Sequence, residues 1–226
     1  MAIKGVSDFM KEYNKDKIFD IMETTQCNYS NMMKRLLRKK KFSEFVLVFY
    51  SISLIVYPLT SEFFPCSFDA KLSNYFGIIL SIVTLAYSLI NGSAKYAERI
   101  DGAEKVLNSV KTLKRNLTDD NLENIKADYE KLMEKAEYRD DVDFFRTVKQ
   151  KCNELGIKWC KYKSDIKDKE SKCDQKTENN GEYKKLNNYL SEISPFIQQC
   201  KIIFEFVWYA LVFAIPIALF FVCFFI

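Results

Sequence analysis

Hydrophobic residues in this chain gather in three long blocks that polar segments separate. The first two blocks span residues 42–60 and 72–90, and together they contain one charged residue, Glu44. A helix rises 1.5 Å per residue and needs about 20 apolar residues to cross a hydrocarbon core about 30 Å thick. We therefore predict a transmembrane helical hairpin over 42–94. The alternative, two buried helices in a soluble core, fits less well, because the remaining chain is too polar to enclose them.

The third block covers residues 202–226 and carries no charge after Glu205. It predicts a third transmembrane helix, kinked at Pro216 because proline removes one helical hydrogen bond. Glu205 lies about one turn inside this block. We expect its carboxylate to extend to the membrane surface, as charged side chains near the end of a span commonly do.

The polar segment 1–41 ends in a basic cluster directly before the first span. Because Lys and Arg near span ends mark the cytoplasmic side, residues 1–41 and 95–201 are predicted to be cytosolic and the loop 61–71 to lie outside. A short amphipathic helix and a loosely ordered lead-in both remain compatible with residues 1–30. The cluster is expected to contact anionic lipid headgroups, and it comprises Lys34, Arg35, Arg38, Lys39, Lys40 and Lys41.

The segment 95–201 repeats apolar residues at spacings of three and four, which is typical of helices packed along one face. Three such stripes, over 100–117, 122–136 and 144–159, predict a small helical bundle. Breaks are predicted at 118–120, with Asp120 and Glu123 as a capping box, and at 139–141. Residues 162–182 read as a polar connector, and 183–201 as a helix bent near Pro195. No strand pattern occurs, so the predicted fold is all-α.

One face of the second span carries small and hydroxyl-bearing residues. They recur at intervals of four, three and four, which places them on the same side of a helix: Gly77, Ser81, Thr84 and Ser88. Such a face allows close packing of helices. It is also compatible with the wetted wall of a pore, and both readings can hold in an oligomer.

Composition argues against several other classes of protein. A net charge of +4, from 34 basic and 30 acidic residues, is too balanced to indicate direct nucleic-acid binding. The chain has no His and 7 scattered Cys, which excludes His-based catalysis and leaves no zinc-ligand spacing. A metal site built from Glu137 and the acidic residues 140, 141 and 143 is less favoured than a solvated helix start. We predict neither a cofactor nor an enzymatic activity.

Short motifs in the middle of the chain resemble the SLATT family of two-transmembrane effector domains. A helix beginning Y-x-E-R follows the hairpin, and 128–132 resembles a Y-x-x-[IL]-L helix. The segment 137–144 resembles an E-N-H-S-D-[IV]-D-[YF] motif, with Arg139 in place of the His. The resemblance covers residues 30–150, without the third span, and its motif residues are Tyr96, Glu98, Arg99, Asp141 and Asp143.

This resemblance implies a bacterial antiphage effector of the abortive-infection type, which oligomerises and permeabilises the inner membrane when a partner sensor is triggered. The subgroup that it most resembles is linked to reverse transcriptases, and others are linked to nucleotide-signal synthases. The expected partners are therefore lipids, further copies of the chain and such an operon partner. The alternative function is a non-permeating membrane anchor that recruits a soluble partner through its cytosolic helices.

Overall fold

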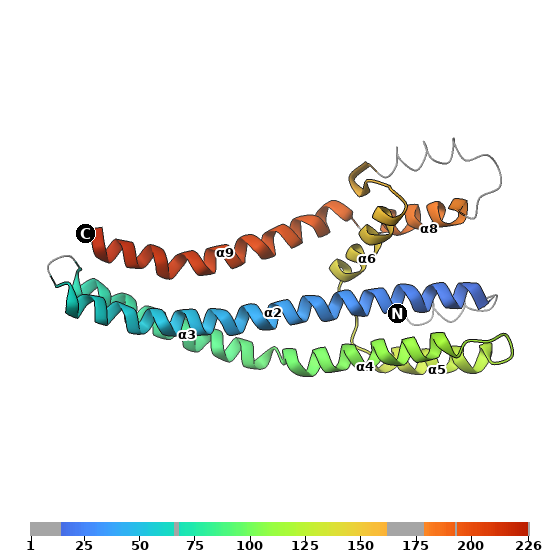
Figure 1. The fold of residues 1–226 in the computed structure, drawn as a ribbon, viewed down its shortest axis with the longest axis horizontal. Helices are drawn as coiled ribbons and strands as arrows, with labels where there is room; N and C mark the ends of the chain where they lie inside the picture. The colour runs from blue at the N-terminus through green and yellow to red at the C-terminus, as the bar shows by residue number, and fades with distance from the viewer. Residues whose placement is uncertain (1–14, 66–67, 162–178, 193, 226) are drawn as a thin grey trace. The chain divides into compact units, whose positions relative to one another are not determined.

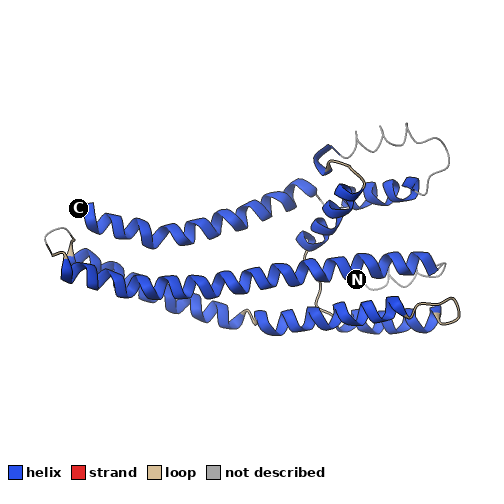
Figure 2. Cartoon of the chain, viewed as in Figure 1, coloured by secondary structure: helices blue, strands red, loops and turns tan. Residues whose placement is uncertain are grey.

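The structure is a computed structural model that describes residues 15–65, 68–161, 179–192 and 194–225. These residues form helices and short connections and contain no strand, which confirms the predicted all-α fold class (Figures 1 and 2). The helices, in chain order, are α2 (Lys15–Phe63), α3 (Ala70–Ser93), α4 (Tyr96–Arg115), α5 (Leu122–Lys135), α6 (Asp141–Glu154), the 3-10 helix η1 (Trp159–Lys161), α8 (Asn179–Glu192) and α9 (Pro195–Phe225).

Helix α2 is much longer than the predicted first span. It runs without interruption for 49 residues, from Lys15 to Phe63. The sequence contains no Gly or Pro from residue 15 to residue 57, so nothing in it breaks the helical hydrogen bonds before Pro58. Residues 15–41 are therefore the first half of this helix, so residues 15–30 are not a loosely ordered lead-in.

The chain divides into two compact units, and α2 contributes to both. The first, which we call the polar unit, consists of residues 1–35 and 99–199. The second, the apolar unit, consists of residues 36–98 and 200–226. The predicted membrane segments 42–94 and 202–226 thus fall in the apolar unit, and nearly all of the predicted helical domain 95–201 falls in the polar unit.

The polar unit is built around the first half of α2. Ile18, Met22, Tyr29 and Met32 follow one another at helical spacing on this helix, and each is at most 4% exposed. Much of the stripes predicted on α4 and α6 is buried as well, at Ala103, Val106, Leu107, Val110, Phe144, Phe145, Val148 and Cys152. The predicted bundle therefore exists, but the sequence did not indicate that α2 belongs to its core.

The end of α6 differs from the prediction. The helix ends at Glu154 because Gly156 adopts a φ of 64°, a left-handed conformation that glycine accepts without strain. The Ile157 amide then donates to the Cys152 carbonyl at 2.8 Å, a bond typical of a helix C-terminus. Trp159 consequently lies in η1, whereas the sequence predicted it on the α6 stripe.

The start of α5 also corrects a local prediction. The residue at the N-cap is Asn121 and not Asp120, and its side chain makes no capping bond. Instead it accepts from the Thr118 amide at 2.8 Å and donates to the Asn116 carbonyl at 2.7 Å. The break between α4 and α5 is where the sequence predicted it. The Asn121 side chain, and not a capping box, stabilises the turn.

The predicted bend near Pro195 is a break between two helices. Helix α8 ends at Glu192, and α9 begins at Pro195 itself. Proline suits the first position of a helix, since that position needs no N–H and its backbone angle is already helical. Of the predicted connector 162–182, residues 162–178 lie outside the described residues.

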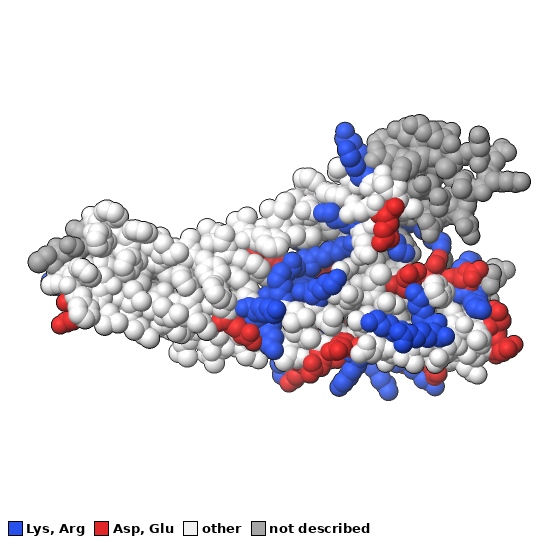
Figure 3. Space-filling view, in the orientation of Figure 1, with Lys and Arg blue, Asp and Glu red and all other residues white. Residues whose placement is uncertain are grey.

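The apolar unit contains the second half of α2, α3 and α9. All three helices are long and apolar enough to cross a membrane. The unit has a small core of buried side chains, Val46, Tyr50, Tyr57, Phe68, Leu80 and Cys223. Many other large apolar side chains are exposed. Figure 3 shows a long stretch of surface with few charged side chains. A surface of this kind is suited to contact with the hydrocarbon core of a bilayer.

Two tyrosines of α2 bind the backbone of α9 at its proline. Pro216 has no N–H, so it leaves the carbonyl of Val212 without its helical donor. The Tyr50 hydroxyl donates to this carbonyl at 2.9 Å. The Tyr57 hydroxyl donates to the carbonyl of Pro216 itself. The Tyr50 hydroxyl on α2 thus supplies the donor that α9 lost, and the Tyr57 hydroxyl adds a second bond between the two helices.

We expect Tyr50→Phe to destabilise the apolar unit by about 1 kcal/mol, because it leaves the Val212 carbonyl unpaired in an apolar setting. Unfolding of the purified protein in mixed micelles would measure the change. Tyr75→Phe is the control, since Tyr75 is 60% exposed. In a Pro216→Ala background the cost should shrink, because the new backbone N–H at position 216 can serve the same carbonyl. An unchanged cost in that background would contradict the explanation.

Candidate functional site

The small-residue face of α3 makes few contacts within the chain. Ser81 and Ser88 are exposed, and Gly77 and Thr84 are partly buried. The Ser81 hydroxyl donates to the Gly77 carbonyl at 2.8 Å, and the Thr84 hydroxyl donates to the Leu80 carbonyl at 2.7 Å. These bonds satisfy the hydroxyls within the helix, which lets the face lie in lipid, against another helix or against water.

Gly77 shows the openness of this face most directly. A Cβ placed on it would meet no atom within 4 Å. The glycine is therefore not required for any close helix approach inside a single chain. The predicted roles of the face, packing between copies or lining a pore, both concern an assembly and stay predictions.

The basic cluster on α2 is not uniform. Lys34 and Lys41 are exposed, and Lys39 and Lys40 are partly buried. Arg38 lies with its Cζ 5.5 Å from the centre of the Phe206 ring on α9. These four lysines are at least partly exposed, and their contact with lipid headgroups stays a prediction.

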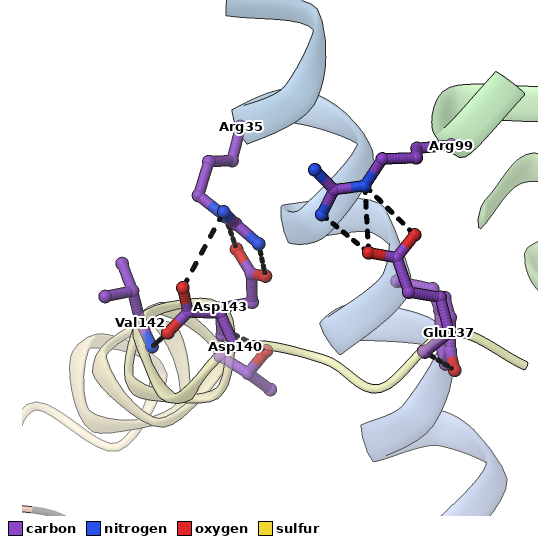
Figure 4. A network of polar contacts seen from close by, with 8 residues as sticks. Arg35, Arg99, Glu137, Asp140, Val142 and Asp143 are labelled. Atoms are coloured by element: carbon purple, nitrogen blue, oxygen red, sulfur yellow. Dashed lines mark hydrogen bonds and ion pairs between the residues drawn. The ribbon is translucent and has the colours of Figure 1, made fainter. Parts of the chain in front are cut away.

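Arg35 departs from that expectation, because it is buried in the polar unit and does not face lipid. Its Nε and Nη2 donate to the two oxygens of Asp143 at 2.9 and 2.8 Å. Asp143 is completely buried, and Asp140 lies 3.7 Å from Nη1 of the same guanidinium (Figure 4). A planar guanidinium matches a carboxylate with two parallel bonds, so this pair fixes α6 against α2.

A second ion pair connects the start of α4 with the loop before α6. The Arg99 Nε lies 2.9 Å and 3.2 Å from the two oxygens of Glu137, and Nη2 contacts Oε1 as well (Figure 4). The backbone carbonyl of Glu137 accepts a bond from the Tyr29 hydroxyl of α2 at 2.9 Å. This loop is therefore held by α2 and by α4 at a single residue.

The predicted motif residues have different surroundings. Arg99 and Asp143 each form a two-pronged ion pair, while Asp141 is exposed at the start of α6. Glu98 pairs with Lys95 at 3.3 Å, and Tyr96 is partly buried. The sequence did not indicate that Arg35 and Glu137 are the partners of Asp143 and Arg99. It contains many residues of opposite charge, and nothing in it specifies which of them form pairs.

Three of the acidic residues around position 140, Glu137, Asp140 and Asp143, have partners within the polar unit. Asp140 accepts the Val142 amide at 3.2 Å as the N-cap of α6, which confirms the predicted helix start. Arg139, which replaces the motif's His, lies with its Cζ 4.0 Å from the Phe144 ring centre. Over the described ranges, no group of three acidic or Cys side chains is arranged to hold a metal ion.

A polar cleft of about 530 Å³ lies within the polar unit, between α2, α6 and α8. Its walls include Glu23 and Thr24 of α2 and Lys151 and Glu154 of α6, so both signs of charge face it. The Lys151 ammonium lies 3.4 Å from the Thr24 hydroxyl. The sequence gave no indication of this cleft, because its residues come from helices that lie far apart in the chain.

Two cysteines of the polar unit lie in or beside its core: Cys152 is buried, and Cys27 is partly buried. Burial raises the pKa of Cys152 from 9.0 to about 11. Burial, with the negative charge of Glu23 as a smaller cause, also raises the pKa of Cys27. Both thiols are therefore protonated at neutral pH, and a protonated thiol is a poor nucleophile.

The fold and its ion pairs define a class of protein. It is an all-α protein with three helices that suit a bilayer and a helical bundle that ion pairs hold together. The sequence profile that matches the chain describes the SMODS and SLOG-associating 2TM effector domain family 5, SLATT_5, and covers residues 10–222. The chain belongs to this family.

The family match extends further than the motifs suggested. It includes α8 and most of α9, whereas the resemblance of the motifs ended near residue 150. The third apolar helix is thus part of the region that the family shares. The match does not distinguish the subgroup linked to reverse transcriptases. No curated protein and no solved structure matches the chain.

We expect Arg35→Ala and Asp143→Asn each to destabilise the polar unit by about 3–5 kcal/mol, because each leaves a buried group without its partner. Chemical unfolding followed by circular dichroism would measure the loss. Glu98→Gln is the matched control, since its pair with Lys95 is exposed and should contribute less than about 1 kcal/mol. Equal effects of the three variants would show that the buried pair does not hold α6.

Iodoacetamide should modify Cys160 in the folded protein at neutral pH and spare Cys152, because Cys160 is exposed and Cys152 is buried with a raised pKa. Mass spectrometry of the alkylated peptides reads out both sites, and unfolded protein is the control. A neutral Cys152 thiol stabilises the fold below its unfolded pKa of 9.0. This contribution should disappear as the pH rises towards about 11.

Proposed function

We propose that this protein is the membrane effector of a bacterial antiphage system of the abortive-infection type. It assembles with further copies of itself and permeabilises the inner membrane when a partner sensor is triggered. The single observation that carries the proposal is the open hydroxyl-bearing face of α3 in a chain of an effector family.

The surface of the apolar unit supports a membrane location. The most apolar window of the segment Ala70–Arg115 is 6% buried, and that of Pro195–Phe225 is 11% buried. A soluble protein that exposed so much contiguous apolar surface would aggregate. In a bilayer the same surface contacts lipid or another copy of the chain.

The α3 face supports assembly. Small residues allow the backbones of two helices to approach closely, and this approach drives association where no hydrophobic effect operates between helices. A ring of such faces would also present the hydroxyls of Ser81 and Ser88 towards a common axis. Hydroxyl groups on that axis can bind water, which lowers the energy barrier for ions to cross the membrane there.

The proposed orientation follows from the basic residues. Lys34 and residues 38–41 precede the apolar part of α2, and Lys95 follows α3, which favours a cytosolic position for both ends of the hairpin. The polar unit would then face the cytosol, where a sensor or its product acts. We propose a reverse transcriptase, its nucleic-acid product or a nucleotide-signal synthase as that operon partner. Direct binding of nucleic acid by this chain and an enzymatic activity are not part of the proposal.

The alternative function is a non-permeating anchor that recruits a soluble partner. The cleft of about 530 Å³ in the polar unit favours it, because a mixed-charge cleft can accept a polar ligand or a segment of another protein. An anchor needs the apolar unit only for attachment. The two functions therefore differ in whether the α3 face matters.

We expect Gly77→Leu and Ser81→Leu to abolish toxicity and the collapse of membrane potential in triggered cells. Gly77→Leu is the sharper variant, since a Cβ at Gly77 meets nothing within 4 Å and the single chain can accommodate it. A potential-sensitive dye and viable counts are the readouts. Ala86→Leu is the control, because it adds similar volume on the opposite side of the same helix.

The outcomes separate the two functions, provided that immunoblots show equal amounts of each variant in the membrane. Loss of toxicity with Gly77→Leu but not with Ala86→Leu supports assembly through the α3 face. Full toxicity of both variants, with an intact membrane potential, excludes permeabilisation and leaves the anchor.

A further inference from the structure

We propose that the apolar unit contains a discrete binding site for an anionic phospholipid. The site takes one acyl chain into a cavity between α2, α3 and α9 and places the phosphate beside the basic residues that precede the cavity on α2. The cavity measures about 240 Å³ and is lined by Val46, Leu47, Tyr50, Val83, Thr84, Tyr87, Trp208, Val212 and Ile215.

The chemistry of the cavity walls favours a hydrocarbon chain. Six of the nine residues that line it are aliphatic or Trp. Of the hydroxyls, that of Tyr50 is bonded to the Val212 carbonyl and that of Thr84 to the Leu80 carbonyl. A buried water usually needs two to four polar partners, and these walls offer few. The walls belong to helices that suit a bilayer, where lipid acyl chains surround the protein. An acyl chain is therefore the occupant that we propose.

The charge on α2 selects the headgroup. Lys39 precedes Val46 by seven residues, so it lies on the same side of the helix and about 10 Å nearer its N-terminus. Neither Lys39 nor Lys40 forms an ion pair with any residue that the structure describes. Arg38 stands beside them, on the Phe206 ring. A phosphate at this level could therefore contact two or three cations while its chain reaches the cavity.

Nearby acidic residues do not cancel this charge. Residues 38–41 contribute four positive charges, against Glu44 on α2 and Glu205, which adjoins Phe206 on α9. An oxygen of Glu205 accepts the Tyr209 hydroxyl at 2.6 Å, so this carboxylate already has a donor within its own helix. The remaining excess of positive charge fits an anionic headgroup better than a zwitterionic one.

The protein carries its own reporter for this site. Trp208 forms part of the cavity wall and is 54% exposed. The only other tryptophan is Trp159, in the polar unit. In a Trp159→Phe background, all tryptophan fluorescence comes from the cavity. Bromine on an acyl chain quenches it only at short range.

The experiment uses full-length protein of this background in vesicles of phosphatidylcholine with a minor fraction of phosphatidylglycerol. Bromine is placed on the chains of one lipid or of the other, so the total composition never changes. We expect brominated phosphatidylglycerol to quench Trp208 far beyond its share of the lipid. One favourable basic contact is worth about a fivefold preference.

Two variants test the two halves of the site. Lys39→Gln should lower the preference for phosphatidylglycerol about fivefold. Lys41→Gln, which removes the same charge from another side of α2, should change it much less. Val83→Phe fills the cavity from α3 and should weaken quenching by either brominated lipid. Circular dichroism and gel filtration check that each variant is folded.

Quenching in proportion to lipid composition would overturn the proposal, as would equal effects of Lys39→Gln and Lys41→Gln. Unchanged quenching in Val83→Phe would show that the chain does not occupy the cavity. Inorganic phosphate added outside the vesicles should not displace the lipid, since it has no chain for the cavity. The site requires only membrane insertion, so its failure and the failure of permeabilisation are independent.

Discussion

A polar backbone in hydrocarbon must find its hydrogen-bond partners within the protein, and this constraint governs the apolar unit. It explains why the apolar segments are helices and why the hydroxyls of Ser53, Ser81 and Thr84 bond to carbonyls one turn back. It also explains the contact between α2 and α9, where the Tyr50 hydroxyl replaces the donor that Pro216 removed. The proline is tolerated because a neighbouring helix supplies a hydrogen bond, and the two helices are joined at that point.

The polar unit is governed by the desolvation of charge. A carboxylate as buried as Asp143 is acceptable only with a partner that satisfies both its oxygens, and Arg35 does so. Arg35 lies on α2 only a few residues before the apolar part of the helix begins. The bundle is thus attached to the same helix that would enter the membrane. Because α2 is continuous, it belongs to the core of both units.

The two units suggest a division of labour for an effector. The apolar unit exposes faces that a bilayer or further copies can cover, and the polar unit presents a cleft that a ligand or partner can reach. No described residue lies within 4 Å of a Cβ placed at Gly77 on the α3 face, and the described residues leave the cleft open. The proposed lipid site adds a third open position, at which the composition of the membrane could influence the packing of α2, α3 and α9.

The sequence by itself determined the all-α class, the three apolar helices and most of the buried stripes of the bundle. These features depend on local composition and periodicity, which one segment expresses without help from another. Only the tertiary structure decided that residues 15–35 belong to the bundle core, that Arg35 and Asp143 meet, and that Tyr50 lies opposite Val212. The Arg35–Asp143 pair joins positions 108 residues apart, and the Tyr50–Val212 contact joins positions 162 residues apart. Many charges and hydroxyls along the chain could have met in such pairs, and the packing of whole helices selects which of them do.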